Sequence, residues 1–137
     1  MRNKKSKMCK ILTQKKGAAI VEFALVLPLL VMLLFGIIEM GRAFYTWSVM
    51  SEATREGARV GIVEIDDTEA ATVAETATSD FLNQMSMTGV AVNADITQIG
   101  GVDMVRVQAT FDFQPFGLQG IIPAFTINAR SIMRQEG

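Results

Sequence analysis

The sequence contains no histidine and a single cysteine, and these two absences exclude several kinds of chemistry. Cys9 has no partner for an internal disulfide, and no Cys/His set exists that would hold zinc. Without histidine, neither a Ser-His-Asp triad nor a Cys-His pair can form. Asp66, Asp67 and Glu69 cluster at a predicted helix start, where acids favour the helix dipole; a calcium site there is the minor alternative. We therefore expect a protein that is not an enzyme and that has no metal site and no cofactor.

Acidic residues are absent from the first 21 positions. Residues 1–17 carry seven basic residues, whereas residues 18–137 carry six basic and all 14 acidic residues, a net charge of −8. A basic segment directly before an apolar run follows the positive-inside pattern, which places the N-terminus in the cytoplasm and the bulk of the chain outside. A nucleic-acid-binding tail is the minor reading of the same charges, so we expect no nucleic-acid partner.

One long apolar run extends from Gly17 to Ile38, with Glu22 as its single charge. As a helix these residues span about 33 Å, enough to cross a bilayer core of roughly 30 Å. Pro28 removes one backbone hydrogen bond and is expected to bend or loosen the helix. A carboxylate costs roughly 2–3 kcal/mol at mid-membrane and less near the interface, so Glu22 requires a reason. The run predicts a single-pass membrane protein.

The helical pattern continues beyond this run, and we expect one helix over residues 18–63. Glu52 with Arg55, and Glu56 with Arg59, form i,i+3 pairs of opposite sign on a polar face. The opposite arc is apolar or small, and its members are Ala43, Trp47, Val49, Met50, Ala53, Gly57, Val60 and Gly61. Within that arc, Ala53, Gly57 and Gly61 would let another element pack closely.

Glu39 and Arg42 stand where the apolar run ends. They either mark the membrane interface or contact a partner subunit or assembly platform, and the sequence leaves both readings open. The charged residues Arg55, Glu56 and Arg59 are candidates for the same kind of partner contact.

The remaining residues, 64–137, predict a small extracytoplasmic domain. A second helix is expected over residues 68–86, with an apolar face of Ala70, Val73, Ala74, Ala77, Phe81 and Met85. Alternating segments from residue 90 to 96, 105 to 113 and 125 to 130 predict a three-stranded antiparallel sheet, with a turn at Gly100-Gly101 and one wet face. Four side chains are expected in its core: Phe111, Phe113, Phe125 and Ile127. The apolar loop 115–123 either covers the sheet or contacts a partner. The predicted class is α+β.

The residues around Gly17 resemble the processing site of type IV prepilins, with a basic leader, a glycine, and a Glu-aromatic pair at the fifth and sixth positions after it. The resemblance implies that an inner-membrane prepilin peptidase cuts between Gly17 and Ala18, so that residues 1–17 are a leader peptide. It also makes Glu22 and Phe23 the residues of recognition and assembly. A helix places Ala18 and Glu22 on one face, and in a fibre Glu22 would meet the Ala18 ammonium of a neighbour.

Three stretches together make the resemblance more specific: GAAIVEFA from Gly17, GIIEMGR from Gly36, and ATREGAR from Ala53. The chain resembles the TadE-like pseudopilins, minor pilin-like proteins of the tight-adherence (Flp, type IVc) pilus system. The resemblance implies a role in pilus biogenesis, adherence and biofilm formation. It also implies other pilins, the inner-membrane assembly platform and membrane lipid as partners. Two alternatives stay open: an uncleaved, membrane-anchored binding module, and a pseudopilin of type II secretion.

Overall fold

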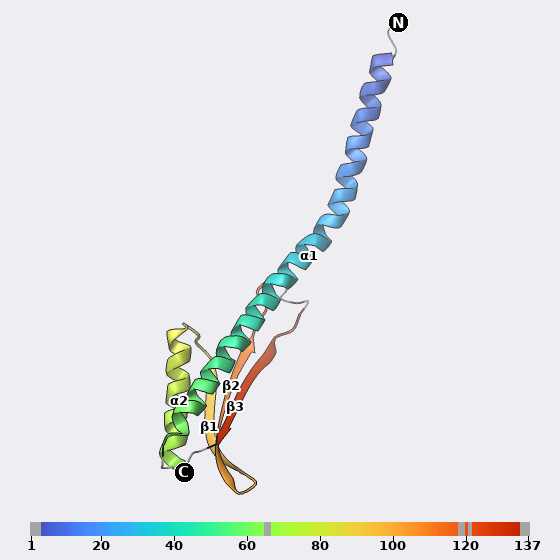
Figure 1. Ribbon diagram of the computed structural model, residues 1–137. Helices are drawn as coiled ribbons and strands as arrows, with labels where there is room; N and C mark the ends of the chain where they lie inside the picture. The colour runs from blue at the N-terminus through green and yellow to red at the C-terminus, as the bar shows by residue number, and fades with distance from the viewer. Residues whose placement is uncertain (1–3, 65–66, 118–119, 121, 135–137) are drawn as a thin grey trace. The chain divides into compact units, whose positions relative to one another are not determined.

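The computed structural model describes residues 4–64, 67–117, 120 and 122–134, with the backbone alone for residues 4–16 and 67–68. The chain forms two helices followed by three strands (Figure 1): α1 (Lys4–Gly61), α2 (Asp67–Gln84), β1 (Ala91–Ile99), β2 (Val102–Phe113) and β3 (Phe125–Arg134). The predicted α+β class, with a long N-terminal apolar helix, is confirmed. The chain divides into two compact units, Met1–Ile38 and Glu39–Gly137.

Helix α1 begins at Lys4, earlier than the predicted start at residue 18, and it ends at Gly61. Between Lys4 and Lys16 the chain contains neither glycine nor proline; it has six lysines and one each of leucine, methionine and glutamine, which all favour helix. No residue there stops the helix. Pro28 lies inside α1.

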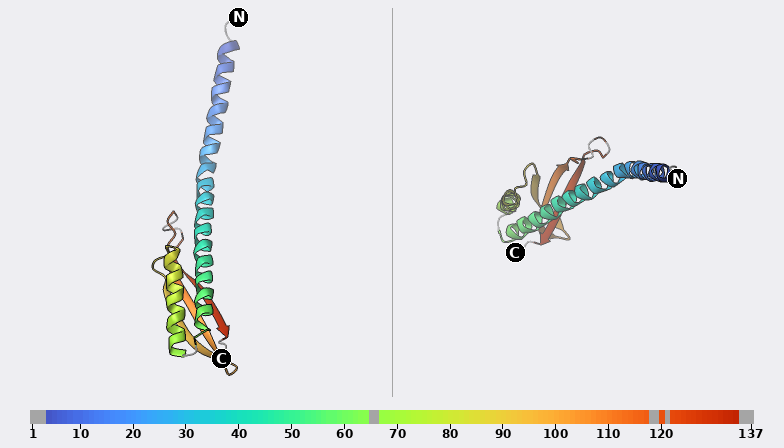
Figure 2. Two further views of the ribbon diagram at one scale, coloured as in Figure 1. Left: turned by 60° about the vertical axis from the view of Figure 1, so that its left-hand side comes forward. Right: turned by 90° about the horizontal axis from the view of Figure 1, so that it is seen from above.

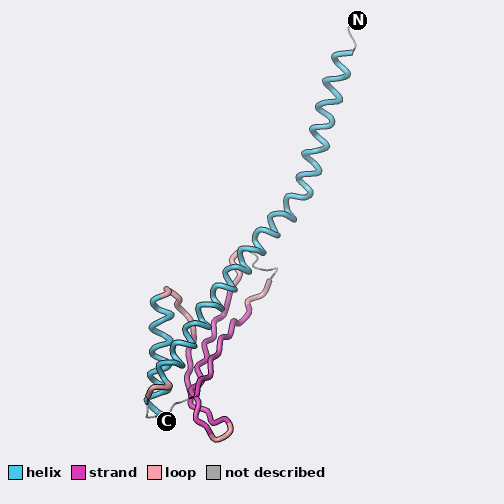
Figure 3. The backbone as a smooth tube through the Cα atoms, viewed as in Figure 1, coloured by secondary structure: helices cyan, strands magenta, loops and turns pink. Residues whose placement is uncertain are grey.

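The three strands form one antiparallel sheet in the order β1-β2-β3. Ile99 pairs with Val102 across Gly100 and Gly101, whose φ angles of 63° and 77° fit a two-residue hairpin turn. Because this turn needs only two residues, both strands extend to its edge and are longer than predicted, as the β1–β2 hairpin in Figure 3 shows. Strand β3 likewise continues past the predicted end at residue 130 to Arg134.

One face of the sheet packs against α2 and the part of α1 that follows Ile38. One core cluster joins α1, α2, β2 and β3 through Met50, Ala53, Leu82, Ala109, Phe113, Ile127 and Ala129. A second cluster lies towards the end of α1 and contains Ala58, Ala74, Val105 and Val107. The other sheet face is polar, and there Arg106 of β2 pairs with Asp95 of β1. The sheet therefore has one dry and one wet face, as the alternation predicts.

Helices α1 and α2 lie side by side in this unit (Figure 2, left). A Cβ atom added at Gly57 would lie 1.9 Å from Thr78 Oγ1 and 2.6 Å from the Ala74 carbonyl oxygen. At Gly61, an added Cβ would lie 2.9 Å from the Ala74 Cβ. The stripe of small residues on α1 is thus occupied by α2, so its role is packing within the chain.

One predicted core residue, Phe125, is exposed, and so are two residues predicted on the apolar faces of the helices, Met85 and Trp47. Phe125 is 45 % exposed because it lies at the start of the edge strand β3, where its ring lies beside the Phe113 ring, at 5.2 Å between centroids. Met85 is exposed because α2 ends at Gln84, and its buried line instead continues through Thr78 and Leu82. Trp47 is also 45 % exposed, since α1 turns it to the side of the face that carries Met50.

Candidate functional site

The four residues predicted to govern processing and initial assembly lie near the start of the apolar run of α1. Gly17, Ala18, Glu22 and Phe23 are all exposed. A Cβ added at Gly17 would meet nothing within 4 Å, so this glycine is not required by packing inside the chain. Ala18 and Glu22 are separated by about one helical turn and therefore share a face of α1. The peptide bond after Gly17 and the carboxylate of Glu22 are both accessible to other molecules.

The stretch Gly17–Gly61 of α1 is long and apolar enough to cross a membrane. Its most apolar 18-residue window has a mean hydropathy of 2.7, and no part of that window is buried. The exposed side chains within residues 17–38 include leucine, isoleucine, valine and phenylalanine. Such a surface is compatible with a single-pass membrane protein, because lipid would cover what the chain itself leaves bare.

Glu39 is the first residue after this run, and its side chain is held by other parts of its own unit. Its Oε1 accepts hydrogen bonds from the backbone N–H groups of Phe116 at 2.8 Å and Gly117 at 2.9 Å. Its Oε2 accepts a hydrogen bond from Arg42 Nη1 at 2.7 Å. With Glu39 only 6 % exposed, this buried carboxylate fastens the loop after β2 to α1.

The contacts of Glu39 also favour its charged form. The hydrogen bond from the N–H of Gly117 is the largest influence and burial, which opposes it, is the next. With the N–H of Phe116 and the Arg42 guanidinium, the Gly117 N–H outweighs burial and holds the pKa of Glu39 below its ordinary value. A carboxylate at this position is therefore ionised across the neutral range.

Arg42 links the same site to the sheet. Its guanidinium carbon lies 5.2 Å from the centroid of the Phe113 ring, at the end of β2. Arg42 and Glu39 therefore join α1 to the β2 end and to the loop. Sequence reasoning picked out both residues but missed their contacts, since nothing in the chain indicates which backbone N–H groups a lone glutamate meets. Their role in contacting a partner subunit stays a prediction.

The charged residues further along α1 lie on its exposed side. Arg59 donates to Glu56 through two nitrogens, at 2.9 Å and 2.6 Å, as the i,i+3 spacing predicts. Among the side chains that the structure describes, Glu52 and Arg55 form no ion pair, and both are exposed. Arg55, Glu56 and Arg59 are thus accessible to a partner.

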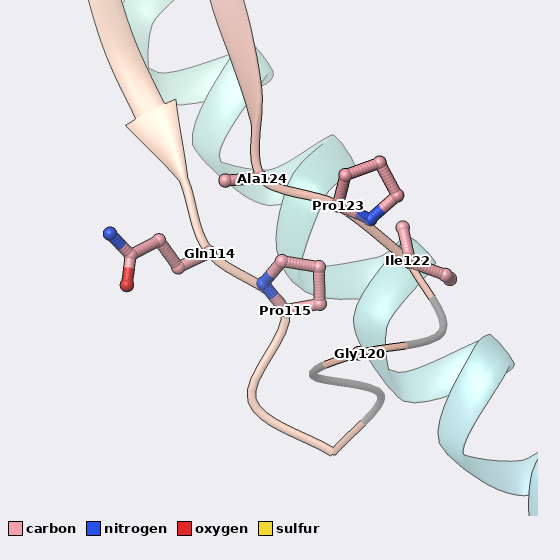
Figure 4. A pocket seen from close by; sticks show the side chains of 6 residues that line it. All are labelled: Gln114, Pro115, Gly120, Ile122, Pro123 and Ala124. Carbon is pink, nitrogen blue, oxygen red and sulfur yellow. The ribbon is translucent and has the colours of Figure 1, made fainter.

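A shallow cavity lies beside the loop after β2 (Figure 4). It is lined by Gln114, Pro115, Gly120, Ile122, Pro123 and Ala124. None of these side chains titrates or acts as a nucleophile, and Gln114 points away from Pro123 and Ile122 in Figure 4. The loop combines the two predicted alternatives: Pro115 is buried, whereas Phe116 is exposed.

Within the described part of the chain, no group of three His, Cys, Asp or Glu side chains comes together as a metal site. Of the acidic cluster considered above, Asp66 lies outside the described residues, and the side chain of Asp67 does as well.

Comparison with known proteins gives one match. Residues 17–59 match the model of the family described as TadE-like protein. The matched segment begins at Gly17 and ends at Arg59, and it covers less than half of the chain. No curated protein and no solved structure matches the chain significantly.

Proposed function

We propose, from the match of residues 17–59 to the TadE-like family model, that this chain is a minor pilin or pseudopilin of a tight-adherence (Flp, type IVc) pilus. It is made as an inner-membrane precursor with a cytoplasmic N-terminus and an extracytoplasmic α+β unit. Prepilin peptidase removes residues 1–17 by cutting after Gly17. The mature protein then supports pilus biogenesis, and through it adherence and biofilm formation.

The observation that carries this proposal is the accessible Gly17–Ala18 bond at the first residue of the family match. Gly17 is exposed and its missing side chain leaves open space. A glycine in a helix costs about 1 kcal/mol relative to alanine, so its presence needs a cause outside the chain's own packing. A protease that accepts only a small residue before the scissile bond supplies that cause.

Glu22 supports the same proposal. It is exposed within an apolar run, where a charge is unfavourable in lipid. Cleavage creates an ammonium group on Ala18, and Glu22 lies one turn away on the same face of the helix. In a fibre, where low dielectric strengthens attraction, the carboxylate pairs with the ammonium of a neighbouring subunit. Pairing offsets the cost of burying either charge alone.

In this function the protein is a substrate and a structural subunit, and it is not an enzyme. Its partners are the prepilin peptidase, other pilins or pseudopilins, the inner-membrane assembly platform and membrane lipid. The accessible Arg55, Glu56 and Arg59 contact the partner subunits. Neither a cofactor nor a nucleic acid takes part.

Processing is tested by expressing the full chain with and without an active prepilin peptidase and measuring the intact mass and N-terminal sequence of the membrane-extracted protein. The expected product begins at Ala18, and only when the peptidase is present. Gly17→Val should abolish the cut. Gly41→Val is the matched control, because a Cβ there also meets nothing within 4 Å, and it should be cut normally.

A chain that still begins at Met1 beside an active peptidase would overturn the proposal and favour an uncleaved, tethered binding module. A cut that occurs, together with a deletion of this protein that impairs protein secretion and leaves pili intact, would instead assign the protein to type II secretion.

A further inference from the structure

A group of large apolar side chains is left exposed just beyond the end of the apolar run. Four lie on α1, namely Met40, Phe44, Tyr45 and Trp47, and the fifth is Phe116 on the loop after β2; together they are called the exit belt. Phe116 is 80 % exposed and Phe44 is 64 % exposed. The rings of Phe44 and Trp47 lie 5.7 Å apart. Exposing so much apolar surface in one place is unfavourable in water.

Phe116 belongs to this group because Glu39 holds it there. The Phe116 N–H donates to Glu39 Oε1 at 2.8 Å, and Glu39 directly follows Ile38, the last residue of the run. Although Phe116 is far from the run in sequence, the loop therefore presents it at the level of the first residue after the run.

The arrangement of the belt around α1 indicates what covers it. At about 100° per residue, Met40, Phe44 and Trp47 lie within a sector of about 60°. Tyr45 lies roughly 100° beyond one edge of that sector. Glu39, to which the loop that carries Phe116 is attached, lies roughly 100° from Met40 in the opposite direction around the helix. The belt therefore surrounds most of the helix. A partner helix contacts one face, whereas a bilayer interface meets every side.

The composition of this segment also fits a lipid interface. Tyrosine and tryptophan combine an apolar body with a polar tip and are enriched at headgroup level. The Arg42 side chain is 49 % exposed, so its guanidinium, although paired with Glu39, also faces water or phosphate. No acidic residue lies between Glu39, whose charge is paired with Arg42, and Glu52. The segment thus contains no unpaired carboxylate to repel anionic lipid.

The depth fits the first part of the belt. Met40 and Phe44 lie roughly 3 Å and 9 Å beyond Ile38 along the helix axis, and the interfacial layer is about 5–8 Å thick on each side. Trp47 lies roughly 14 Å beyond Ile38, at the water side of that layer, and helical side chains tilt towards the N-terminus, so its ring reaches back towards the headgroups. We propose that the exit belt is an interfacial anchor, which inserts into the outer headgroup layer of the membrane and holds this end of the folded unit there. The proposal rests on the membrane span of the proposed function.

The test uses the full chain in phosphatidylcholine–phosphatidylglycerol vesicles at low protein-to-lipid ratio. Trp47 is the only tryptophan, so its fluorescence reports the belt directly. Lipids carrying a spin label near the headgroup should quench Trp47 several-fold more than lipids labelled at the chain centre. In a Trp47→Phe background, Phe116→Trp should behave like Trp47. Val63→Trp, an exposed position beyond the end of α1, should instead be quenched by aqueous acrylamide.

The membrane span is tested separately by Leu30→Trp in the same background, which should be quenched mainly by the deep label. If the deep label quenches Leu30→Trp while acrylamide still quenches Trp47 and Phe116→Trp, the proposed interfacial anchor is wrong and the membrane span is supported. If Leu30→Trp escapes the deep label, the span itself fails. If Trp47 is shielded from acrylamide but unquenched by lipid labels, and the shielding falls on dilution, a second protein subunit covers the belt and the proposal is wrong.

Discussion

At the scale of single residues, the glycines of α1 divide into those that packing requires and those that it does not. Gly57 and Gly61 lie against α2, where an added Cβ would approach Thr78 or Ala74 too closely. Gly17, Gly36 and Gly41 have open space at the same atom. The fold of this chain explains why Gly57 and Gly61 are glycines, and it does not explain Gly17, Gly36 and Gly41. A substitution at Gly17 therefore tests processing without disturbing packing, whereas one at Gly57 tests packing.

Gly57→Ala should therefore destabilise the unit Glu39–Gly137. The new Cβ would overlap Thr78 Oγ1, so α1 and α2 must move apart, and overpacking of this kind costs about 1–3 kcal/mol. Alanine recovers at most about 1 kcal/mol through its higher helix propensity. Gly41→Ala receives the same gain without the overlap and should be neutral or slightly stabilising. Thermal unfolding of the two variants in the same detergent measures the difference. Equal midpoints would contradict the close packing of the helices.

At the scale of elements, the sequence is informative where one pattern decides the outcome. The two helices and three strands can be predicted from the spacing of apolar residues and from the glycines at the turns. The hydrophobic face of each element depends on its own residues. The i,i+3 pair of Glu56 and Arg59 is predictable for the same reason. Contacts between elements are not: Trp47, Met85 and Phe125 are apolar in the right pattern, yet neighbouring elements leave them exposed. The attachment of Glu39 to the N–H groups of Phe116 and Gly117 is likewise a tertiary contact.

This attachment makes the loop after β2 depend on one charge. Glu39→Gln keeps the shape of the side chain but replaces charge-assisted hydrogen bonds by neutral ones and loses the pair with Arg42. Protection of the Phe116 and Gly117 amides against hydrogen exchange should fall on the order of ten-fold. Glu52→Gln, which changes an exposed carboxylate on the same helix, should leave both amides unchanged.

The pH dependence of the loop follows from the lowered pKa of Glu39. Because the folded state holds the pKa below the ordinary value of 4.5, the stabilisation is fully present above that value. It is lost as the pH falls through the lower pKa of the folded state. Protection factors, corrected for intrinsic exchange, should therefore stay constant from neutral pH down to about 4.5 and then decline, and Glu39→Gln should remove this decline. A wild-type profile that falls already near neutral pH would show that another group holds the loop.

At the scale of the whole molecule, the family match covers the first helix and leaves out most of the folded unit. The family match runs from Gly17 to Arg59, so it includes the apolar run and the part of α1 up to Arg59 but neither α2 nor the sheet. The sheet and its polar face are thus outside the matched segment, and the basic residues between Arg2 and Lys16 precede it. A protein that is cut, inserted in a membrane and assembled by its first helix fits this division. The sheet unit then gives the subunit its own surface.

Glu22→Ala tests this division, because it changes the helix without touching the folded unit. The variant should still be cut after Gly17, since the bond and the leader are intact, and its membrane insertion should be at least as favourable because a charge is removed from the apolar run. Incorporation into pili or assembly intermediates should fall by ten-fold or more, on the order expected when one partner of a buried ion pair is removed. Pull-down with the major pilin from cells, beside Glu52→Ala as a control carboxylate outside the apolar run, measures this. Normal assembly of Glu22→Ala would mean that the carboxylate merely sits at headgroup level, and the ammonium–carboxylate contact between subunits would have to be abandoned even if cleavage at Gly17 were established.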